Sequence, residues 1–376
     1  MTSSASGVTE GGAASSWTEA KRQATALGAI PSSFSVVIRA LIYDQVNFKA
    51  KMRASNKYQV ARLLKGPSFK LMLYHATKIL RPRALAGQTS WNVGSMMAEF
   101  EPLDLAALIA SFVYYRKCKK LLPEQAWGKF APLLLKEPQF GAVVGSAIPE
   151  IGTGVGIITS TFQHFAHCSF ALKHAAAYEK YVAQLKASPA TQVLRLEEES
   201  FGCSSSQVAV MLLSGAGFGT DLGNGLSIAF DPTRATLSLK DDWAVRMRYA
   251  RVWIDLALKG LDQPSEKMSA RFFPSSELHE WLKKMFPLIR NGEIGWLQRT
   301  KADLNAKSAP ELFAIQKGAE DIPDALRDVF SLEEITSMEE EDFDALVDQI
   351  DEDQASGKHP DVLDGKELSA LEDIVA

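Results

Sequence analysis

Three histidines in one apolar stretch are the first candidates for chemistry. His167 and His174 are seven residues apart, and His164 falls close to them on the same side of the helix that this stretch predicts. Imidazole nitrogens are good zinc ligands, and a zinc site needs three or four N, S or O ligands. However, no carboxylate follows until Glu179, and phenylalanines surround the histidines. We therefore expect packing histidines rather than a metal site.

Two glycine clusters, at residues 152–156 and 215–219, could in principle form phosphate-binding loops. Neither cluster completes the GxGxxG pattern, and neither follows a predicted strand, which a dinucleotide site requires. The chain also lacks a P-loop, a GxSxG elbow, an HExxH zinc motif and an EF-hand loop. The sequence therefore predicts no cofactor and no standard catalytic centre.

The cysteines and the composition place limits on the class of protein. Cys118, Cys168 and Cys203 are odd in number and far apart, which argues against a disulfide framework and fits a reducing cytoplasm. Apolar residues make up 46% of the chain and charged residues 23%, as in ordinary globular proteins. The first residues lack the basic and apolar regions of a signal peptide. We expect a cytoplasmic protein.

One stretch, residues 140–162, is apolar enough to suggest a membrane span. Pro149 and Glu150 interrupt it near its centre, and five glycines break it further. A carboxylate in the middle of a bilayer would cost a few kcal/mol, roughly 2.5–3.5 on insertion scales. We predict instead a glycine-rich hinge between two core helices, and no membrane-spanning segment.

The elements that position these residues are predicted to be helices. Apolar residues recur at intervals of three and four in segment after segment, and prolines and glycines separate the segments. The fold class predicted is therefore all-α and multi-helical. The one exception expected is a small β-hairpin, in which residues 226–230 and 235–239 flank Asp231-Pro232.

The charge is distributed very unevenly along the chain. The net charge is −4, but residues 330–376 hold 16 acidic and 2 basic residues, so residues 1–329 carry +10. With the composition shifts, this predicts four parts: a disordered leader (1–16), a helical domain (17–235), a further helical segment (240–318) and an acidic tail (330–376).

The acidic tail allows two interpretations. Residues 333–353 contain eleven acids and no base, which is typical of a solvated tail. The same residues carry an apolar helical face formed by Ile335, Met338, Phe343, Leu346, Val347 and Ile350. Of these, Ile335, Phe343, Leu346 and Ile350 are the candidate partner-binding residues. We predict that the tail folds back on the basic body and competes with an external partner.

Several short elements follow one another in a fixed order between residues 30 and 235. They are Ile30-Pro31; Val60 to Phe69, with Gly66-Pro67; Phe100, Leu105, Leu108 and Ile109; Trp127 to Phe130; Ser146 to Gly152; Glu197, Phe201-Gly202, Ser205, Val208 and Ala209; and Ala229-Phe230. Together they resemble the HDOD domain family, which would make residues 17–235 an HDOD-like helical domain.

The resemblance implies a degenerate HD site. HD-superfamily hydrolases hold metal ions with histidines and an adjacent His-Asp pair. Here the matching positions are Lys129, Pro149-Glu150 and Ser205, and Phe230 stands in the terminal His-His segment. Neither lysine nor proline is a metal ligand, so the resemblance implies a regulatory rather than a hydrolytic domain.

The sequence therefore favours a non-enzymatic bacterial signalling or regulatory module that interacts with protein partners. One alternative is an enzyme with an unrecognised site near the hinge at Pro149–Gly156; a buried cluster of titratable groups there would favour it. The other is nucleic-acid binding by basic residues interleaved with aromatics, including Lys49, Lys51 and Phe48. No recognised motif organises these groups, so nucleic-acid binding is the less favoured alternative.

Overall fold

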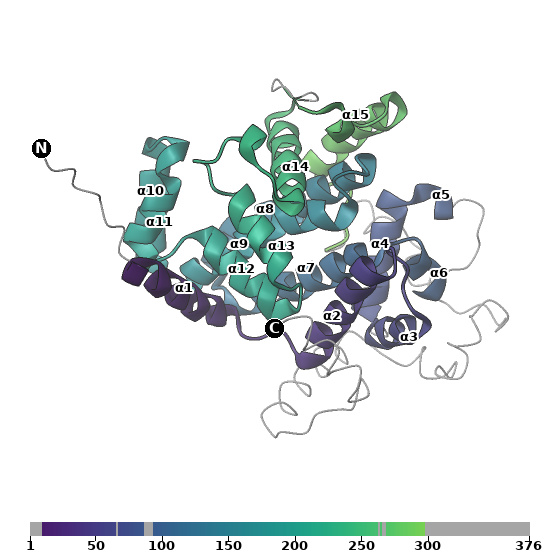
Figure 1. The fold of residues 1–376 in the computed structure, drawn as a ribbon, viewed down its shortest axis with the longest axis horizontal. Coiled ribbons are helices and arrows are strands. Elements are labelled where there is room, and N and C mark those ends of the chain that lie inside the picture. The colour runs from purple at the N-terminus through teal and green to yellow at the C-terminus, as the bar shows by residue number, and fades with distance from the viewer. Residues whose placement is uncertain (1–9, 65–66, 86–92, 262–263, 265–267, 298–376) are drawn as a thin grey trace, which may run out of the picture.

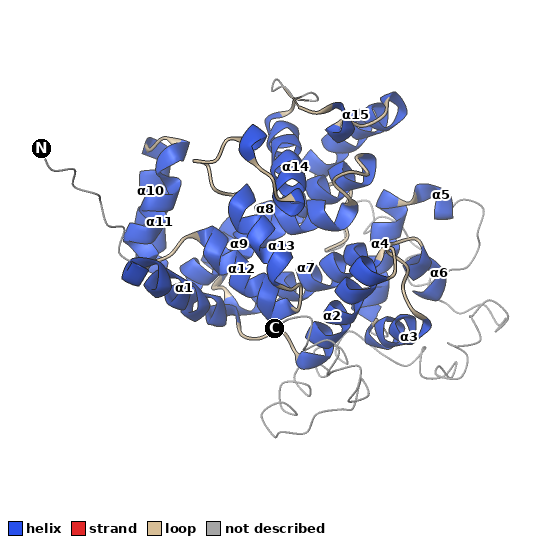
Figure 2. Cartoon of the chain, viewed as in Figure 1, coloured by secondary structure: helices blue, strands red, loops and turns tan. Residues whose placement is uncertain are grey.

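The computed structural model describes residues 10–64, 67–85, 93–261, 264 and 268–297. Within these ranges the chain forms fifteen α-helices and four short 3-10 segments and no β-strand (Figure 2). The predicted all-α fold class is confirmed. Residues 298–318 and the acidic tail, with Ile335, Phe343, Leu346 and Ile350, lie outside the described residues.

The helices of the first half are α1 (Glu10–Ala24), α2 (Ser32–Asn47), α3 (Ala54–Leu63), α4 (Pro67–Leu80), α5 (Pro82–Leu85), α6 (Val93–Ala98), α7 (Pro102–Leu121) and α8 (Glu124–Ala147). Those of the second half are α9 (Thr153–Lys173), α10 (Ala175–Ala187), α11 (Val193–Phe201), α12 (Ser205–Ala216), α13 (Thr220–Ala229), α14 (Asp242–Lys259) and α15 (Ser276–Arg290). The 3-10 segments are η1 (Thr25–Leu27), η2 (Ala190–Gln192), η3 (Thr236–Ser238) and η4 (Ala270–Phe272).

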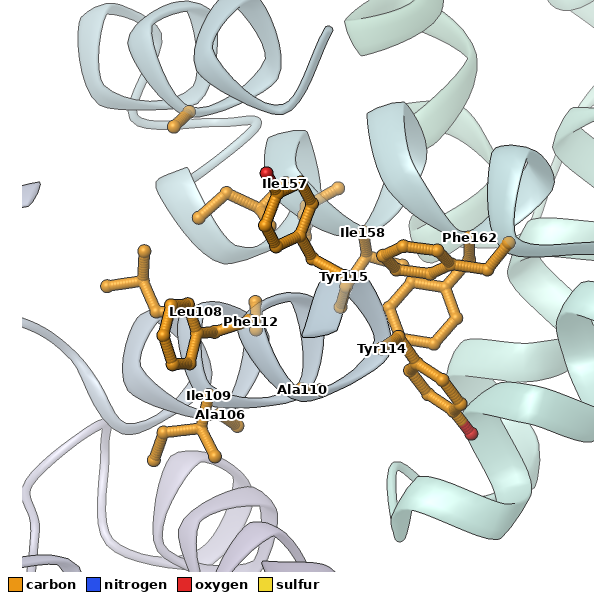
Figure 3. Packing of buried hydrophobic residues seen from close by; sticks show 14 of the residues in the cluster. Ala106, Leu108, Ile109, Ala110, Phe112, Tyr114, Tyr115, Ile157, Ile158 and Phe162 are labelled. Atoms are coloured by element: carbon orange, nitrogen blue, oxygen red, sulfur yellow. The ribbon is translucent and has the colours of Figure 1, made fainter. Parts of the chain in front are cut away.

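Helices α7, α8 and α9 form the centre of the molecule, and the other helices cover them. Figure 1 shows α2–α6 gathered at one end and α10 and α11 at the other. In the core the rings of Tyr114 on α7 and Phe162 on α9 meet edge to face, with centroids 5.7 Å apart (Figure 3). The hydroxyl of Tyr114 donates to the carbonyl oxygen of Leu212, 2.8 Å away on α12. Burial of this apolar surface is the main stabilising term of the fold.

The turn between α8 and α9 is the glycine-rich hinge that the sequence predicts between two core helices. A Cβ added to Gly145 on α8 would lie 2.1 Å from the carbonyl oxygen of Gly152, so the two backbones are in contact. Gly152 itself has a φ of +82°, a left-handed conformation that favours glycine. Close helix packing and a tight turn therefore account for these glycines without a phosphate ligand.

The predicted β-hairpin is wrong. Residues 226–229 end α13, and residues 236–238 form η3. The buried positions Leu222, Leu226 and Ala229 recur at helical intervals and face the core. Beyond the helix, the side chain of Asp231 accepts hydrogen bonds from the backbone N–H and hydroxyl of Thr233, and this Asx turn occupies the place of the expected hairpin loop.

Helix α1 begins at Glu10, within residues 1–16, for which the sequence predicts a leader. Within α1, the hydroxyl of Ser16 accepts a hydrogen bond from the side-chain amide of Gln207 on α12. The core also continues across the predicted boundary at residues 235–240: Met247, Trp253 and Phe286 belong to the same buried cluster as α7–α9.

No single helix in the described ranges is both long enough and apolar enough to cross a membrane. In that part of the chain one pair of segments, residues 16–27 and 32–47, meets the test of length and composition, and the pair is bent by 119°.

Candidate functional site

The α8–α9 turn is surrounded by buried polar side chains that come from distant parts of the chain. Asp104, in the first turn of α7, is 4% exposed, and its Oδ1 accepts a hydrogen bond from the backbone N–H of Gly154, 2.7 Å away. Gly152 at the N-cap of α9 has no side chain, so Asp104 caps α9 from a neighbouring helix. Burial, opposed by the charge of Arg81 and by the Gly154 hydrogen bond, raises the pKa of Asp104 to about 6.

Arg81 connects the end of α4 with the same turn. Its guanidinium donates to the hydroxyl oxygens of Ser146, at 2.6 Å, and Thr153, at 3.4 Å. It also donates to the carbonyl oxygen of Glu99 at 3.1 Å, and it lies 3.5 Å from Oδ2 of Asp104. One arginine therefore joins α4, α7, α8 and α9.

Arg246 on α14 holds the turn from the other side. Its guanidinium donates to the carbonyl oxygens of Glu150 and Ile151, each at 2.8 Å, and stacks 4.7 Å above the ring of Trp243. Pro149 and Glu150 themselves are exposed. A buried carboxyl group with a raised pKa next to arginine could act as a general acid or base. Its hydrogen bond here goes to the protein backbone, as in a structural cap.

A second buried cluster surrounds Glu197 on α11, which is fully buried. Its carboxylate accepts hydrogen bonds from the backbone N–H of Ser205 at 2.6 Å, the Ser205 hydroxyl at 2.8 Å and the Tyr181 hydroxyl at 3.0 Å. Burial raises the pKa of Glu197 even though the bonds from Ser205 and Tyr181 oppose it. Ser205 opens α12, so the cluster fixes α12 against α10 and α11.

The three candidate histidines contact three different partners, and the partner of His167 is Glu197, whose Oε1 lies 3.9 Å from Nε2 of His167. Nε2 of His164 lies 2.7 Å from Oε2 of Glu137, and Nε2 of His174 lies 2.9 Å from the amide nitrogen of Gln23. Burial, reinforced by the charges of His164 and Arg251, lowers the pKa of His167 to about 3, so its imidazole is neutral. Across the described ranges no group of three or more His, Cys, Asp or Glu side chains is arranged to hold a metal ion.

Glu137 belongs to a buried charge network between α8, α9 and α14. The guanidinium of Arg251 lies 3.5 Å from Oε2 of Glu137 and 2.9 Å from Oδ1 of Asp255. Burial alone would raise the pKa of Glu137, but the nearby His164 and Arg251 outweigh it and lower that pKa. The network stabilises the packing of α14 on α8 and α9.

The structure does not bring the degenerate HD positions together. Lys129 is half exposed near the start of α8 and forms an ion pair with Glu179 of α10. Glu150 lies beyond the other end of α8, and at 1.5 Å per residue the two positions are separated by roughly 27 Å of helix. Ser205 is 1% exposed within the Glu197 cluster. Phe230 follows α13, with its ring centroid 6.0 Å from the Arg251 guanidinium.

The corner between α2 and α3 combines exposed apolar side chains with unusual backbone angles. Val46 and Phe48 are 67% and 40% exposed, which is high for large apolar side chains. The next two residues, Lys49 and Ala50, have φ values of 50° and 60°. Two successive non-glycine residues in the left-handed region store backbone strain, and such strain is often found at binding sites.

A buried carboxylate holds this corner in place. Asp44 is fully buried and accepts hydrogen bonds from the backbone N–H of Arg53 at 2.9 Å, its Nε at 2.7 Å and the amide of Asn56 at 2.8 Å. The guanidinium of Arg53 then lies 5.0 Å from the ring centroids of both Tyr43 and Phe48. The exposed Phe48 ring therefore has a defined position, as a binding surface requires.

In the sequence, Phe48 and the neighbouring lysines stand out only as a weak nucleic-acid candidate, and nothing there marks Asp44 as their buried anchor. The available signal was that Asp44 is the one acidic residue of α2. The α2–α3 corner, defined as Val46, Phe48, Lys49, Lys51 and Lys57, is the candidate functional site. Comparisons of the chain with protein-family models, curated proteins and solved structures found no match.

Proposed function

We propose that the protein is a non-enzymatic signalling or regulatory module that acts by binding a protein partner. The observation that carries this proposal is the α2–α3 corner, where Val46 in the last turn of α2 and Phe48 at its end are exposed beside the strained residues Lys49 and Ala50. Apolar side chains surrounded by a polar rim are typical of protein interfaces. Here the rim is formed by Lys49, Lys51 and Lys57, which are exposed.

The resemblance to HDOD domains supports the same function. The positions that match metal ligands in that superfamily take part in ordinary structural contacts: Lys129 pairs with Glu179, and Ser205 donates to Glu197. These contacts stabilise helix packing and need no metal. A domain of this kind regulates by presenting a surface to another protein.

Affinity purification of the full chain from its native cell would test the proposal. A V46S/F48S variant should lose a co-purifying protein, because both substitutions remove exposed apolar contact area. F273S is the matched control, since Phe273 is 39% exposed and lies in another part of the molecule. A partner that F273S and V46S/F48S retain equally would overturn the assignment of the corner.

The non-enzymatic part of the proposal needs its own measurement. Metal analysis of the purified protein, together with a phosphodiesterase and phosphatase screen, should give neither stoichiometric metal nor turnover. Stoichiometric metal with turnover would overturn it.

An enzyme at the α8–α9 turn is the second candidate function. The observation in its favour is Asp104, whose pKa of about 6 suits a general acid or base and whose carboxylate lies beside Arg81. A broad hydrolase substrate screen of the wild type and D104N would test it. Turnover in the wild type that D104N lacks, while keeping its fold, would favour the enzyme.

A further inference from the structure

The sequence around the α2–α3 corner contains no acidic residue over a long distance. Residues 45–98 hold ten lysines and arginines and no aspartate or glutamate. Those of them that the structure describes form the end of α2 and helices α3–α6, which lie together at one end of the molecule (Figure 1). The excess positive charge of the body is thus concentrated in one region, and the α2–α3 corner belongs to it.

The opposite charge is concentrated in residues 333–353, which hold eleven acids and no base. Within this segment Phe343, Leu346, Val347 and Ile350 recur at intervals of three, four and seven residues. This spacing is typical of a helix that binds in an apolar site. We infer that residues 333–353 dock on the α2–α3 corner of the same chain. The inference rests on the proposed function, because it names the ligand of that surface.

The α2–α3 corner and residues 333–353 are complementary in apolar character and in charge. Val46 and Phe48 are exposed and offer apolar area to Phe343 and Leu346. Lys49, Lys51 and Lys57 are exposed on the same corner and carry the charge that the carboxylates of the segment need. Electrostatic complementarity selects this partner, and the apolar contact adds affinity.

The length of the intervening chain permits the contact. Residues 298–332 connect Leu297 to the acidic segment, and an extended chain spans up to about 3.3 Å per residue. This reach exceeds the diameter of a domain of this size, whose radius of gyration is roughly 19 Å. A tethered ligand has an effective concentration in the millimolar range, so even a weak contact is populated.

The contact regulates the corner, because it occupies the surface that a partner needs. An external partner must displace residues 333–353 and must itself present acidic and apolar side chains. Its apparent affinity is reduced by the fraction of molecules in which the corner is occupied.

Photo-cross-linking in the full-length chain tests the inference. A benzophenone amino acid replaces Phe48 in one variant and Phe273 in the control variant, since the two side chains are 40% and 39% exposed. We expect cross-links from position 48 to residues 333–353 at a yield roughly tenfold above position 273, because only the tethered segment reaches a high local concentration there. Mixing isotope-labelled and unlabelled protein distinguishes contacts within one chain from contacts between copies.

Charge reversal provides the second arm of the experiment. K49E/K51E in the position-48 variant should lower the yield severalfold, because attraction is replaced by repulsion. D344K/D348K should lower it as well, and the combined variant should recover much of it. A yield unaffected by both reversals would overturn the inference, as would cross-links from position 48 to a second copy, to nucleic acid or to no partner.

The inference and the proposed function can fail separately. If a partner protein depends on Val46 and Phe48 but position 48 never cross-links to residues 333–353, only the inference fails. If the cross-link forms and responds to charge reversal but no partner depends on the corner, the inference stands and the proposed function fails.

Discussion

Gly141 and Gly156 face each other across α8 and α9 so closely that a Cβ on Gly156 would lie 1.9 Å from the carbonyl oxygen of Gly141. Backbone atoms cannot move aside as the end of a flexible side chain can. G156A should therefore lower the free energy of unfolding by roughly 3 kcal/mol, at the upper end of overpacking costs. Urea denaturation of the full-length chain measures this change.

Gly128 is the control for that prediction. It lies in α8, the helix that contains Gly141, but nothing lies within 4 Å of a Cβ added there. G128A should raise stability by roughly 0.5–1 kcal/mol, because alanine loses less backbone entropy on folding. Equal shifts in G156A and G128A would contradict the close contact of α8 and α9.

Asp104 should make stability depend on pH. Its folded-state pKa of about 6 lies above the model-compound value of 3.8, so the folded protein binds the proton more tightly than the unfolded chain. The stability that this proton provides is complete below about pH 3.8 and lost as pH rises through 6, a change of roughly 3 kcal/mol. In D104N, unfolding measured from pH 3.5 to 7 should lack this decline.

D104A distinguishes the effect of the Asp104 charge from the effect of its capping hydrogen bond to α9. It removes the oxygen that accepts the hydrogen bond from Gly154, so it should destabilise the protein by about 1–3 kcal/mol throughout the pH range. If D104N and the wild type show the same pH slope, Asp104 does not titrate in this window.

Glu137 should show the opposite pH dependence. Its pKa is lowered below 4.5, so its contribution is present above pH 4.5 and lost as pH falls through the folded-state pKa. E137Q leaves Arg251 without its buried carboxylate and should cost roughly 3 kcal/mol at pH 7. The difference in the free energy of unfolding between the wild type and E137Q should therefore disappear at acidic pH.

E199Q serves as the control, because Glu199 pairs with Arg195 on the surface, where both side chains are more than half exposed. E199Q should change the free energy of unfolding by no more than about 0.5 kcal/mol. If the free energies of unfolding of E137Q and the wild type differ by the same amount at all pH values, Glu137 does not stabilise the protein through its charge.

The thiols should be unreactive in the folded protein. Cys118, Cys168 and Cys203 are all buried, and burial raises the pKa of Cys203 to about 12 and also that of Cys168. A thiol reagent at pH 8 should therefore react at least about a hundredfold more slowly than in denaturant, because reaction requires local opening. Rapid modification of one thiol in the native state would show that its helix opens readily.

Restoring the HD ligand types should not restore a metal site. In K129H/P149H/E150D the new side chains would stand at opposite ends of α8, separated by roughly 27 Å of helix. Metal analysis should therefore find no stoichiometric ion. Tight binding of one metal ion by the triple variant would show that these positions meet in another conformation.

The fold could be predicted where the sequence pattern is local. Apolar residues at helical intervals identify α4, α7 and α9, and the glycines and Pro149 identify the turn before α9. The pattern failed at α13, because apolar residues on both sides of Asp231-Pro232 resemble a hairpin when the packing of the segment is unknown. That packing includes a close helix contact at Gly225, where a Cβ would lie 2.5 Å from Cβ of Trp243.

The buried polar clusters could not be predicted in the same way. Arg81, Asp104 and Thr153 meet only through the tertiary fold, and nothing in their spacing along the chain indicates contact. The position of Phe48 likewise depends on Asp44 and Arg53, whose pairing requires the chain to reverse between α2 and α3. Residue types indicate possible chemistry, whereas long-range packing determines which of them meet.

The hydrogen bonds from Arg246 to the carbonyl oxygens of Glu150 and Ile151 have a consequence for biosynthesis. The ribosome makes α9 before α14, and Arg246 follows Ile151 by 95 positions. At a synthesis rate of about 5–20 residues per second, Arg246 is made roughly 5–20 s after the α8–α9 turn that it binds. During that interval the apolar surface of the α8–α9 hairpin lacks its α14 cover. Nascent chains that end before α14 should therefore be retained by chaperones, whereas chains that extend past it should be released.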